Sequence, residues 1–389
     1  MRPSVDSAIT SARAKPSGVT DGENSAHTIS VVLLSPSIMG SPGGIARYAE
    51  GLLTSRVMRD HRYVLNHLTT HKYGSKARKL TLALAAAARV VPWSRRASIA
   101  HALVGSDASC VRKLALLTEA RLCGMRTFAH LHGSSLVEWL QSLAPRWRDL
   151  IIRLIDRCDA VATLGNRLAD YLRGHGLSTL VRVIPNGVHS TPTRRPSTSH
   201  APVILFAGTL GARKGTPELL RAFAQLSERH PEAKLVLMGD GMIDQARQLA
   251  SELGIARRIE CTGWAKSDDV GRAMEQASMF VLPSHHEGMA LSVLEAMMRG
   301  LPVIATPVGE HRTVIEDTRN GLFVPAGNVA ELRDAMDRLL LDRSLADRLG
   351  HAAREKALEE FEISANHERV AAVYDALSGQ TNANAIHRS

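Results

Sequence analysis

The sequence contains few aromatic residues, few cysteines and no long apolar run. Aromatic side chains make up 4% of its 389 residues, and the four cysteines, Cys110, Cys123, Cys158 and Cys261, lack the spacing of metal ligands. Neither a disulfide framework nor a zinc site is expected, which is typical of a reducing cytoplasm. No stretch of 18 apolar residues occurs, so no membrane-spanning helix is expected either.

Two further motifs are absent, and each absence argues against one class of function. No G-x-G-x-x-G motif follows the first strand expected in either half, which disfavours a dinucleotide-dependent oxidoreductase. No DNA-binding motif or aromatic-rich platform accompanies the basic residues of the first half, so nucleic acid is not expected as a partner.

The length and the charge distribution both favour two domains. A chain of 389 residues exceeds what one hydrophobic core usually supports. Residues 1–200 hold 27 Lys and Arg against 12 Asp and Glu, whereas the remainder holds 21 against 26. The two halves are therefore expected to face different partners. Residues 1–28 are rich in Ser, Ala and Gly and have no apolar core, which predicts a disordered segment.

Most of the excess positive charge of the first half lies between residues 51 and 100, which carry ten basic side chains and one acidic side chain. Basic residues at 72–79 and 89–96 flank the apolar run 80–88. This pattern fits a helix that binds an anionic membrane surface through 72–96, and it equally fits a core helix with a basic solvated face.

Short apolar segments alternate with segments of helical periodicity, which predicts an α/β protein with parallel sheets wound by helices. We expect a first Rossmann-like domain over 29–189, a polar linker over 190–200, a second domain over 201–365 and a final segment over 366–389. The expected strands are 29–35, 63–67, 99–104, 127–131, 160–164, 181–184, 203–207, 234–238, 258–262, 280–282 and 302–306.

The most informative stretch covers residues 280–305 and contains Glu287 and Glu295. It predicts a strand, a loop with Glu287, a helix with Glu295 about one turn inside, and another strand. Free N–H groups at the helix start favour a diphosphate. A carboxylate accepts both hydrogens of a vicinal diol, so the two glutamates suit ribose and sugar hydroxyls. The stretch therefore indicates a nucleotide-diphosphate sugar, although the spacing alone also fits a solvated helix.

This stretch resembles the donor-site signature of the retaining nucleotide-sugar glycosyltransferases of family 4. The resemblance implies the GT-B fold, in which two doubly wound Rossmann-like domains face a cleft and a final helix crosses back to the first domain. It implies that Glu287 contacts the donor sugar in catalysis and that Glu295 binds the ribose. Met289 and Ala290 stand where the family commonly has an aromatic residue and a glycine, which leaves the sugar open. Further donor contacts are expected from Gly288, Met289, Ala290 and Leu291.

Residues 208–217 follow an expected strand and begin a helix, with Thr216 predicted as its N-cap and Pro217 in its first turn. Lys214 precedes this helix, where a cation suits the negative charge of a diphosphate leaving group. The family has a Gly-Arg pair and then a Lys-Gly pair here. Lys214 matches the second pair, Thr209 replaces the arginine of the first, and Arg213 is the candidate to compensate.

The first half contributes two glycines and two competing histidines. Gly43 and Gly44 form a loop after the first strand that lets the backbone approach the diphosphate across the cleft. His132 lies where the family often has a histidine near the donor sugar, and it is a candidate catalytic residue. His130 is two residues earlier on the same face of the strand and competes with it.

Residues 261–268 resemble the family segment that frames the nucleobase, with Gly263 and Trp264 as candidates. Because the family segment contacts the base partly through backbone groups, the side chains here do not distinguish uracil from guanine. Asp268 and Asp269 are adjacent and lack the D-x-D spacing of metal-dependent transferases. No metal and no other cofactor is therefore expected, and helix dipoles with Lys214 are expected to supply the positive charge.

The resemblance implies a retaining enzyme that moves a hexose, mannose or glucose, from a UDP- or GDP-sugar to a polyprenyl-linked or polysaccharide acceptor in cell-surface polysaccharide synthesis. The expected location is the cytoplasm or the inner face of the cytoplasmic membrane. One rival is a GT-B nucleotide-sugar epimerase, which needs no acceptor. The other is a non-catalytic nucleotide-sugar-binding scaffold, which Thr209 and Ala290 motivate.

Overall fold

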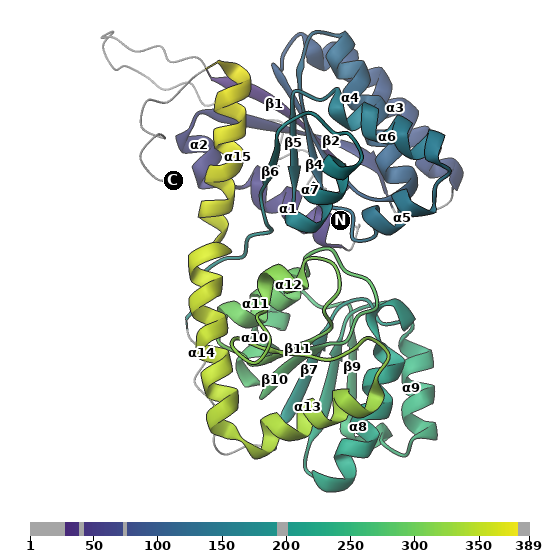
Figure 1. The fold of residues 1–389 in the computed structure, drawn as a ribbon, viewed down its shortest axis with the longest axis vertical. Helices are drawn as coiled ribbons and strands as arrows, with labels where there is room; N and C mark the ends of the chain where they lie inside the picture. Colours follow the sequence, from purple (N-terminus) through teal and green to yellow (C-terminus); the bar gives the residue numbers. More distant parts are fainter. Residues whose placement is uncertain (1–27, 39–42, 73–75, 193–200, 380–389) are drawn as a thin grey trace, which may run out of the picture.

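The computed structural model describes residues 28–38, 43–72, 76–192 and 201–379. Two α/β domains lie one above the other, and two long helices run along one side of both (Figure 1). The prediction of two doubly wound domains is therefore confirmed. Most of the predicted disordered segment 1–28 and of the predicted linker 190–200 lies outside the described residues.

The described part of the first domain is built on six parallel strands in the order β2-β1-β3-β4-β5-β6. The strand β3 is buried along its whole length, as expected of a strand covered by helices on both faces. The strands are β1 (Ile29–Pro36), β2 (Tyr63–His71), β3 (Ile99–Val104), β4 (Arg126–Leu131), β5 (Ala160–Thr163) and β6 (Val181–Val183).

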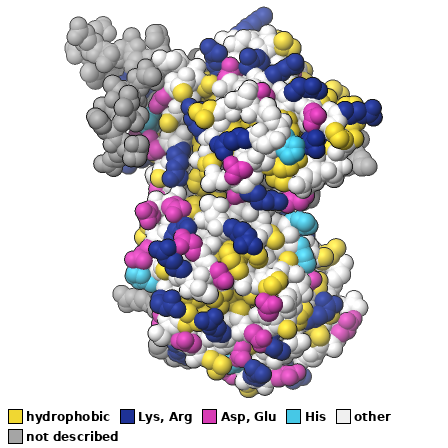
Figure 2. All heavy atoms as spheres, in the orientation of Figure 1, with side chains coloured by type: hydrophobic (Ala, Val, Ile, Leu, Met, Phe, Trp, Pro, Cys, Tyr) yellow, Lys and Arg dark blue, Asp and Glu magenta, His cyan; other side chains and the backbone are white. Residues whose placement is uncertain are grey.

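The helices of the first domain cover both faces of its sheet. They are α1 (Gly44–Leu53), α2 (Arg56–Asp60), α3 (Lys76–Ser94), α4 (Asp107–Leu122), α5 (Leu136–Ser142), α6 (Pro145–Asp156) and α7 (Asn166–Gly174). Lys and Arg side chains gather on the side of this domain where α3, α4 and α6 lie (Figures 1 and 2).

The second domain repeats the architecture with the strand order β12-β11-β10-β7-β8-β9, again all parallel among the described residues. The strand β12 was not predicted, because two residues are too few to show a periodic pattern. The strands are β7 (Val203–Ala207), β8 (Lys234–Met238), β9 (Ile259–Gly263), β10 (Met279–Leu282), β11 (Val303–Ala305) and β12 (Leu322–Phe323).

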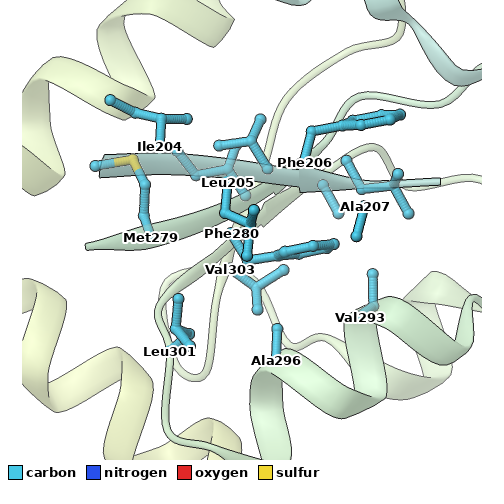
Figure 3. Packing of buried hydrophobic residues seen from close by; sticks show 14 of the residues in the cluster. Ile204, Leu205, Phe206, Ala207, Met279, Phe280, Val293, Ala296, Leu301 and Val303 are labelled. Carbon is cyan, nitrogen blue, oxygen red and sulfur yellow. The ribbon is translucent and has the colours of Figure 1, made fainter. Parts of the chain in front are cut away.

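The core of the second domain fixes the helix that carries Glu295. Val293 and Ala296 on this helix, α11 (Leu291–Met298), face Phe280 and Val303 on the sheet (Figure 3). Glu295 lies between these two buried residues in the sequence, so the packing of α11 on the sheet fixes the direction in which the Glu295 side chain points. The helices of this domain are α8 (Thr216–Arg229), α9 (Ile243–Glu252), α10 (Ser267–Gln276), α11 (Leu291–Met298), α12 (His311–Val314), α13 (Val329–Leu341) and α14 (Arg343–Glu360), with short 3₁₀ turns at Ala212–Lys214 and Ala256–Arg258.

The last helix, α15 (Ile363–Ser378), returns to the first domain (Figure 1). Val370 and Val373 are fully buried in the first-domain core. The Tyr374 hydroxyl bonds Nδ1 of His101 at 2.7 Å, and the Tyr48 hydroxyl donates to Oδ1 of Asn366 at 2.9 Å. The helix α14 packs against α11, so one continuous segment contacts both domains.

One cation is buried in the first domain without an anionic partner. Lys113 on α4 is fully buried, and its Nζ donates to Oγ of Ser109 at 3.1 Å. No described carboxylate pairs with it. Burial, and to a lesser extent the charge of Arg112, lower the pKa of Lys113 to about 7. This side chain therefore costs stability whenever it is charged.

Replacing Lys113 with methionine is expected to stabilise the fold most at low pH. The pKa in the folded protein lies below the ordinary value of 10.5, so the unfolded state holds the proton more tightly. The penalty is complete below pH 7 and disappears as the pH rises toward 10.5. We expect Lys113→Met to raise the free energy of unfolding by ~2 kcal/mol or more at pH 6, and by less at pH 9.5. Urea denaturation at both pH values measures this, with the exposed Lys234→Met as control. No gain at pH 6 would show that Lys113 is stabilised by its surroundings.

Candidate functional site

A cleft of about 570 Å³ lies between the two domains. Its wall is formed by the start of α1 and the loops after β3 and β4, opposite the loops after β7, β8 and β10 and the first turns of α11. Because the strands of each sheet are parallel, these loops meet at the carboxyl edges, where such folds bind ligands. The cleft brings together the predicted residues Gly43, Gly44, His132, Thr209, Arg213, Lys214, Trp264, Glu287, Gly288, Met289, Ala290, Leu291 and Glu295.

Gly263 is the predicted donor-binding residue that does not line the cleft. Its carbonyl oxygen accepts a hydrogen bond from the backbone N–H of Gly239 at 2.8 Å, so this group is used between neighbouring strands. Trp264, the next residue, lines the cleft with 64% of its surface exposed.

Glu287 and Lys214 form an ion pair in the cleft wall. Glu287 is 5% exposed, and its Oε1 also accepts a hydrogen bond from Oγ of Ser284 at 2.8 Å. Lys214 comes from the loop after β7 and Glu287 from the loop after β10, which are neighbouring strands. The sheet therefore brings together two charges that are 73 residues apart.

The surroundings keep Glu287 ionised. Burial by itself disfavours the charged carboxylate, but the Lys214 ammonium, His311 and hydrogen bonds from Lys214 and Ser284 outweigh it. The pKa of Glu287 is consequently below its usual value. The cleft thus holds a buried carboxylate that can face a developing positive charge on a sugar.

Two glycines allow the Glu287 and Lys214 loops to approach their neighbours. A Cβ on Gly309, which has a φ of +56°, would overlap the Glu287 carbonyl oxygen. A Cβ on Gly215, which has a φ of +69°, would overlap the Pro283 carbonyl oxygen. Both close approaches exclude any other residue type.

The predicted N-cap of α8 is wrong by one residue. Gly215, in the left-handed conformation, is the N-cap, and Thr216 is the first helical residue. The Thr216 hydroxyl oxygen instead accepts from the backbone N–H of Gly211 at 3.0 Å. It therefore closes the loop that presents Lys214, and Pro217 keeps its place in the first turn.

Arg213 extends from the same loop and is exposed. Its guanidinium donates to the His286 carbonyl oxygen at 3.1 Å. Thr209 also lines the cleft and carries no charge. The assignment of Arg213 as a substitute for an arginine at 209 stays a prediction.

Glu295 is paired with a residue that the sequence analysis did not identify. Arg47 on α1 of the first domain forms an ion pair with Oε1 of Glu295 and donates to Oγ of Ser267 at 3.1 Å. The side chain of Glu295 is 13% exposed. Arg47 lies three residues after Gly44, on the same face of the helix, which is the one signal that could have identified it.

Met289 belongs to a contact between the domains. Its backbone oxygen accepts from Nδ2 of Asn186 at 2.8 Å, and its sulfur lies 3.3 Å from the backbone nitrogen of Asn186. Gly288 lies against Ser134 of the first domain, since an added Cβ would come within 3.3 Å of the Ser134 Cα. The loop after Glu287 is therefore held from both sides. Asn186 was not predicted, because no local pattern marks it.

His132, and not His130, lines the cleft. His132 is 7% exposed and its Nε2 has no hydrogen-bond partner among the described residues. His130 is fully buried, with Nε2 3.4 Å from the Ile184 carbonyl oxygen. Burial holds the pKa of His132 well below its ordinary value, with further contributions from His130, His101 and Lys113. His132 is thus a neutral group beside the cleft, able to bond a hydroxyl.

The described residues hold neither a metal-binding cluster nor a membrane-spanning helix. They contain no group of three or more His, Cys, Asp or Glu side chains arranged to hold a metal ion. None of their helices combines the length and the apolar character needed to cross a bilayer.

Comparison of the sequence with known proteins adds a family and a relative to this geometry. Residues 192–356 match the family model of the glycosyl transferases group 1. A GDP-mannose-dependent alpha-(1-6)-phosphatidylinositol monomannoside mannosyltransferase of Mycobacterium tuberculosis is 29% identical over 264 residues, 62% of this chain and 68% of the relative. In three curated relatives of this chain, including that mannosyltransferase, the matched part spans 45%, 59% and 68% of the relative's own length.

Two solved structures resemble the whole described fold. Sucrose-phosphate synthase from Thermosynechococcus elongatus superposes with a TM-score of 0.78 at 18% identity, covering 91% of this chain and 100% of that chain. HepE of Anabaena in complex with UDP-glucose gives 0.70 at 18% identity, covering 90% and 100%. The fold is therefore GT-B, and residues 192–356 of the chain are similar to the glycosyl transferases group 1.

Proposed function

We propose that this protein is a retaining glycosyltransferase that moves a hexose from a nucleotide-diphosphate sugar to an acceptor hydroxyl. The observation that carries the proposal is the buried, ionised Glu287, paired with Lys214 in the same cleft as Glu295 and the N-terminus of α11. This arrangement offers a carboxylate to a sugar, a cation and free N–H groups to a diphosphate, and a second carboxylate to a ribose.

The donor is proposed to lie along the edge of the second domain. Its diphosphate would face the start of α11 at Leu291 and Ser292, with Lys214 on one side and Gly43 and Gly44 on the other. The ribose hydroxyls would bond Glu295. The sugar would then extend toward Glu287 and His132, where the cleft narrows between Gly288 and the first domain.

The reaction is proposed to take place on one face of the sugar. The bond from the anomeric carbon to the phosphate oxygen breaks, and the acceptor oxygen forms its bond from the same side while its proton passes to the departing phosphate. Glu287 would stabilise the positive charge on the sugar, and Lys214 with the helix N-terminus would stabilise the leaving diphosphate. We propose that these groups act without a metal cofactor.

The choice of donor and acceptor follows from the relatives as a proposal. UDP-glucose is bound by HepE, and GDP-mannose is used by the mycobacterial relative. We propose UDP or GDP as the nucleotide, glucose or mannose as the sugar, and a lipid-linked or polysaccharide acceptor at the cytoplasmic side of the membrane.

The function is tested by donor turnover in wild type and Glu287→Gln. We expect wild type to consume one of UDP-glucose, GDP-glucose and GDP-mannose and to form a product whose anomeric configuration, measured by NMR, is retained. Glu287→Gln removes the charge but keeps the shape, so turnover should fall about 100-fold or more while the donor Kd changes by less than about fivefold.

The exposed Glu260→Gln serves as the control for that experiment. A changed donor sugar formed without an acceptor would identify an epimerase instead. Donor binding with neither transfer nor hydrolysis would identify a binding protein, and unaltered turnover in Glu287→Gln would remove this residue from the mechanism.

Replacing Lys214 with methionine is expected to shift the acid limb of the pH profile. In wild type the Lys214 charge helps to hold the pKa of Glu287 below its usual value, so the carboxylate loses its charge only at low pH. Without Lys214, burial acts against less opposition and the pKa of Glu287 rises. The pH of half-maximal kcat on the acid side should therefore move upward by about one unit or more. If the acid limb of Lys214→Met lies at the same pH as that of wild type, the Lys214 charge does not lower the pKa of Glu287.

The helix α3 supplies a surface for the proposed membrane contact. Ala86 and Val90 pack in the first-domain core, as the core-helix interpretation requires. On the outer face, however, Leu84 is 63% and Val91 is 48% exposed, beside the exposed Arg89. The side chains of residues 73–80 lie outside the description, so the predicted basic residues Lys76, Arg78 and Lys79 are not placed.

Binding to vesicles tests this surface. We expect the protein to sediment with phosphatidylglycerol vesicles and much less with phosphatidylcholine vesicles, in a salt-dependent way. Since each basic residue near the lipid contributes about 1 kcal/mol, the double variant Arg89→Gln/Arg96→Gln should bind about 30-fold more weakly. Arg257→Gln/Arg343→Gln on the second domain is the matched control. Equal losses in both variants would show that only net charge matters.

A further inference from the structure

The charged side chains that line the cleft decide which cation could bind the donor diphosphate. Among the described lining residues, three side chains are cationic and four are anionic. Lys214 is paired with Glu287, and Arg47 with Glu295. Arg213 is exposed and donates to a backbone carbonyl. A diphosphate that enters this cleft therefore meets two cations that are paired with carboxylates, and Arg213, which belongs to the second domain and has no carboxylate partner among the described residues.

Arg47 is the cation that the donor itself would release. A ribose diol donates two hydrogen bonds to a carboxylate, and Glu295 is 13% exposed, with Oε1 already occupied by Arg47. With little of the Glu295 side chain exposed and Arg47 bound to Oε1, a diol would compete with Arg47 for this oxygen. Ribose binding would therefore exchange the Arg47 hydrogen bond for hydroxyl hydrogen bonds.

The released guanidinium would lie next to the diphosphate. The helices α1 and α11 lie side by side at their N-termini, because an added Cβ on Gly44 would be 3.7 Å from Cδ1 of Leu291. Arg47 is one turn after Gly44, and Glu295 is one turn after Leu291. A rotation of the Arg47 side chain toward the helix starts therefore carries its charge from Glu295 to the place where both N-termini converge.

We propose that Arg47 is a donor-binding residue of the first domain that changes partners, from Glu295 in the empty cleft to the donor diphosphate in the filled one. The inference rests on the proposed function, since it requires a nucleotide diphosphate in this cleft. Arg47 lies on one domain and Glu295 on the other, so the exchange also makes the contact between the domains depend on the donor. A planar guanidinium can bond two phosphate oxygens, which suits it to this role.

The exchange predicts opposite effects on two ligands that differ only in the diphosphate. In Arg47→Gln, Glu295 is free from the start, so uridine or guanosine should bind as tightly as in wild type or more tightly. UDP or GDP loses its charge-assisted hydrogen bonds and should bind about tenfold more weakly or worse. Calorimetry with nucleoside and nucleoside diphosphate in each variant measures the ratio of the two Kd values.

Two further variants sharpen the result. Arg47→Lys keeps the charge but not the planar fork, so it should keep more of the preference for the diphosphate than Arg47→Gln does, which also controls for damage to the domain contact. Arg213→Gln removes the other exposed cation of the cleft, and its loss of preference should be smaller than that of Arg47→Gln. Melting temperatures of all variants report whether the fold is intact.

Each other outcome overturns the inference. Tighter binding of both ligands to Arg47→Gln would make Arg47 a plain competitor for Glu295, and equal weakening of both would make it structural. A selective loss in Arg213→Gln and not in Arg47→Gln would assign the phosphate to Arg213. If wild type binds no nucleoside diphosphate at all, the proposed function fails, and this result is distinct from the others.

Discussion

The ion pair between Glu287 and Lys214 is the interaction on which the site depends. A carboxylate that is 5% exposed can remain charged only if its surroundings replace the lost water, and here an ammonium, a serine hydroxyl and a nearby histidine do so. Gly215 lets the loop with Lys214 lie against the backbone of Pro283, and Gly309 leaves room for the backbone of Glu287. The same packing that buries Glu287 thus keeps it ionised and directs it into the cleft.

The cleft is a joint product of both domains. Asn186 holds the backbone of Met289, Ser134 lies against Gly288, and Arg47 pairs with Glu295. The segment formed by α14 and α15 contacts both domains along one side (Figure 1). Asn366 contributes there, since its side chain bonds the hydroxyl of Tyr48 and the backbone of Pro185. Polar contacts of this kind can be exchanged at modest cost, which suits a cleft that has to admit and release a ligand.

Met289 and Thr209 depart from the family signature, and the structure shows where each of them lies. Met289 is 4% exposed and is used at the domain contact, where its sulfur and backbone oxygen both face Asn186. A flexible thioether fills such an irregular space well. Thr209 lines the cleft without a charge, and the first domain contributes the cation Arg47 to the same cleft.

The sequence by itself determined the two parallel sheets, the loop with Glu287, the helix with Glu295 and the place of Lys214, because periodicity and motifs act over short distances along the chain. It missed β12, which is too short to show a pattern, and it misplaced the cap of α8, where a left-handed glycine took the role expected of Thr216. Only the tertiary structure decided that Arg47 pairs with Glu295 and that Asn186 holds Met289. These partners are more than 100 residues apart, and their contact arises from the docking of two separate domains, which no local pattern records.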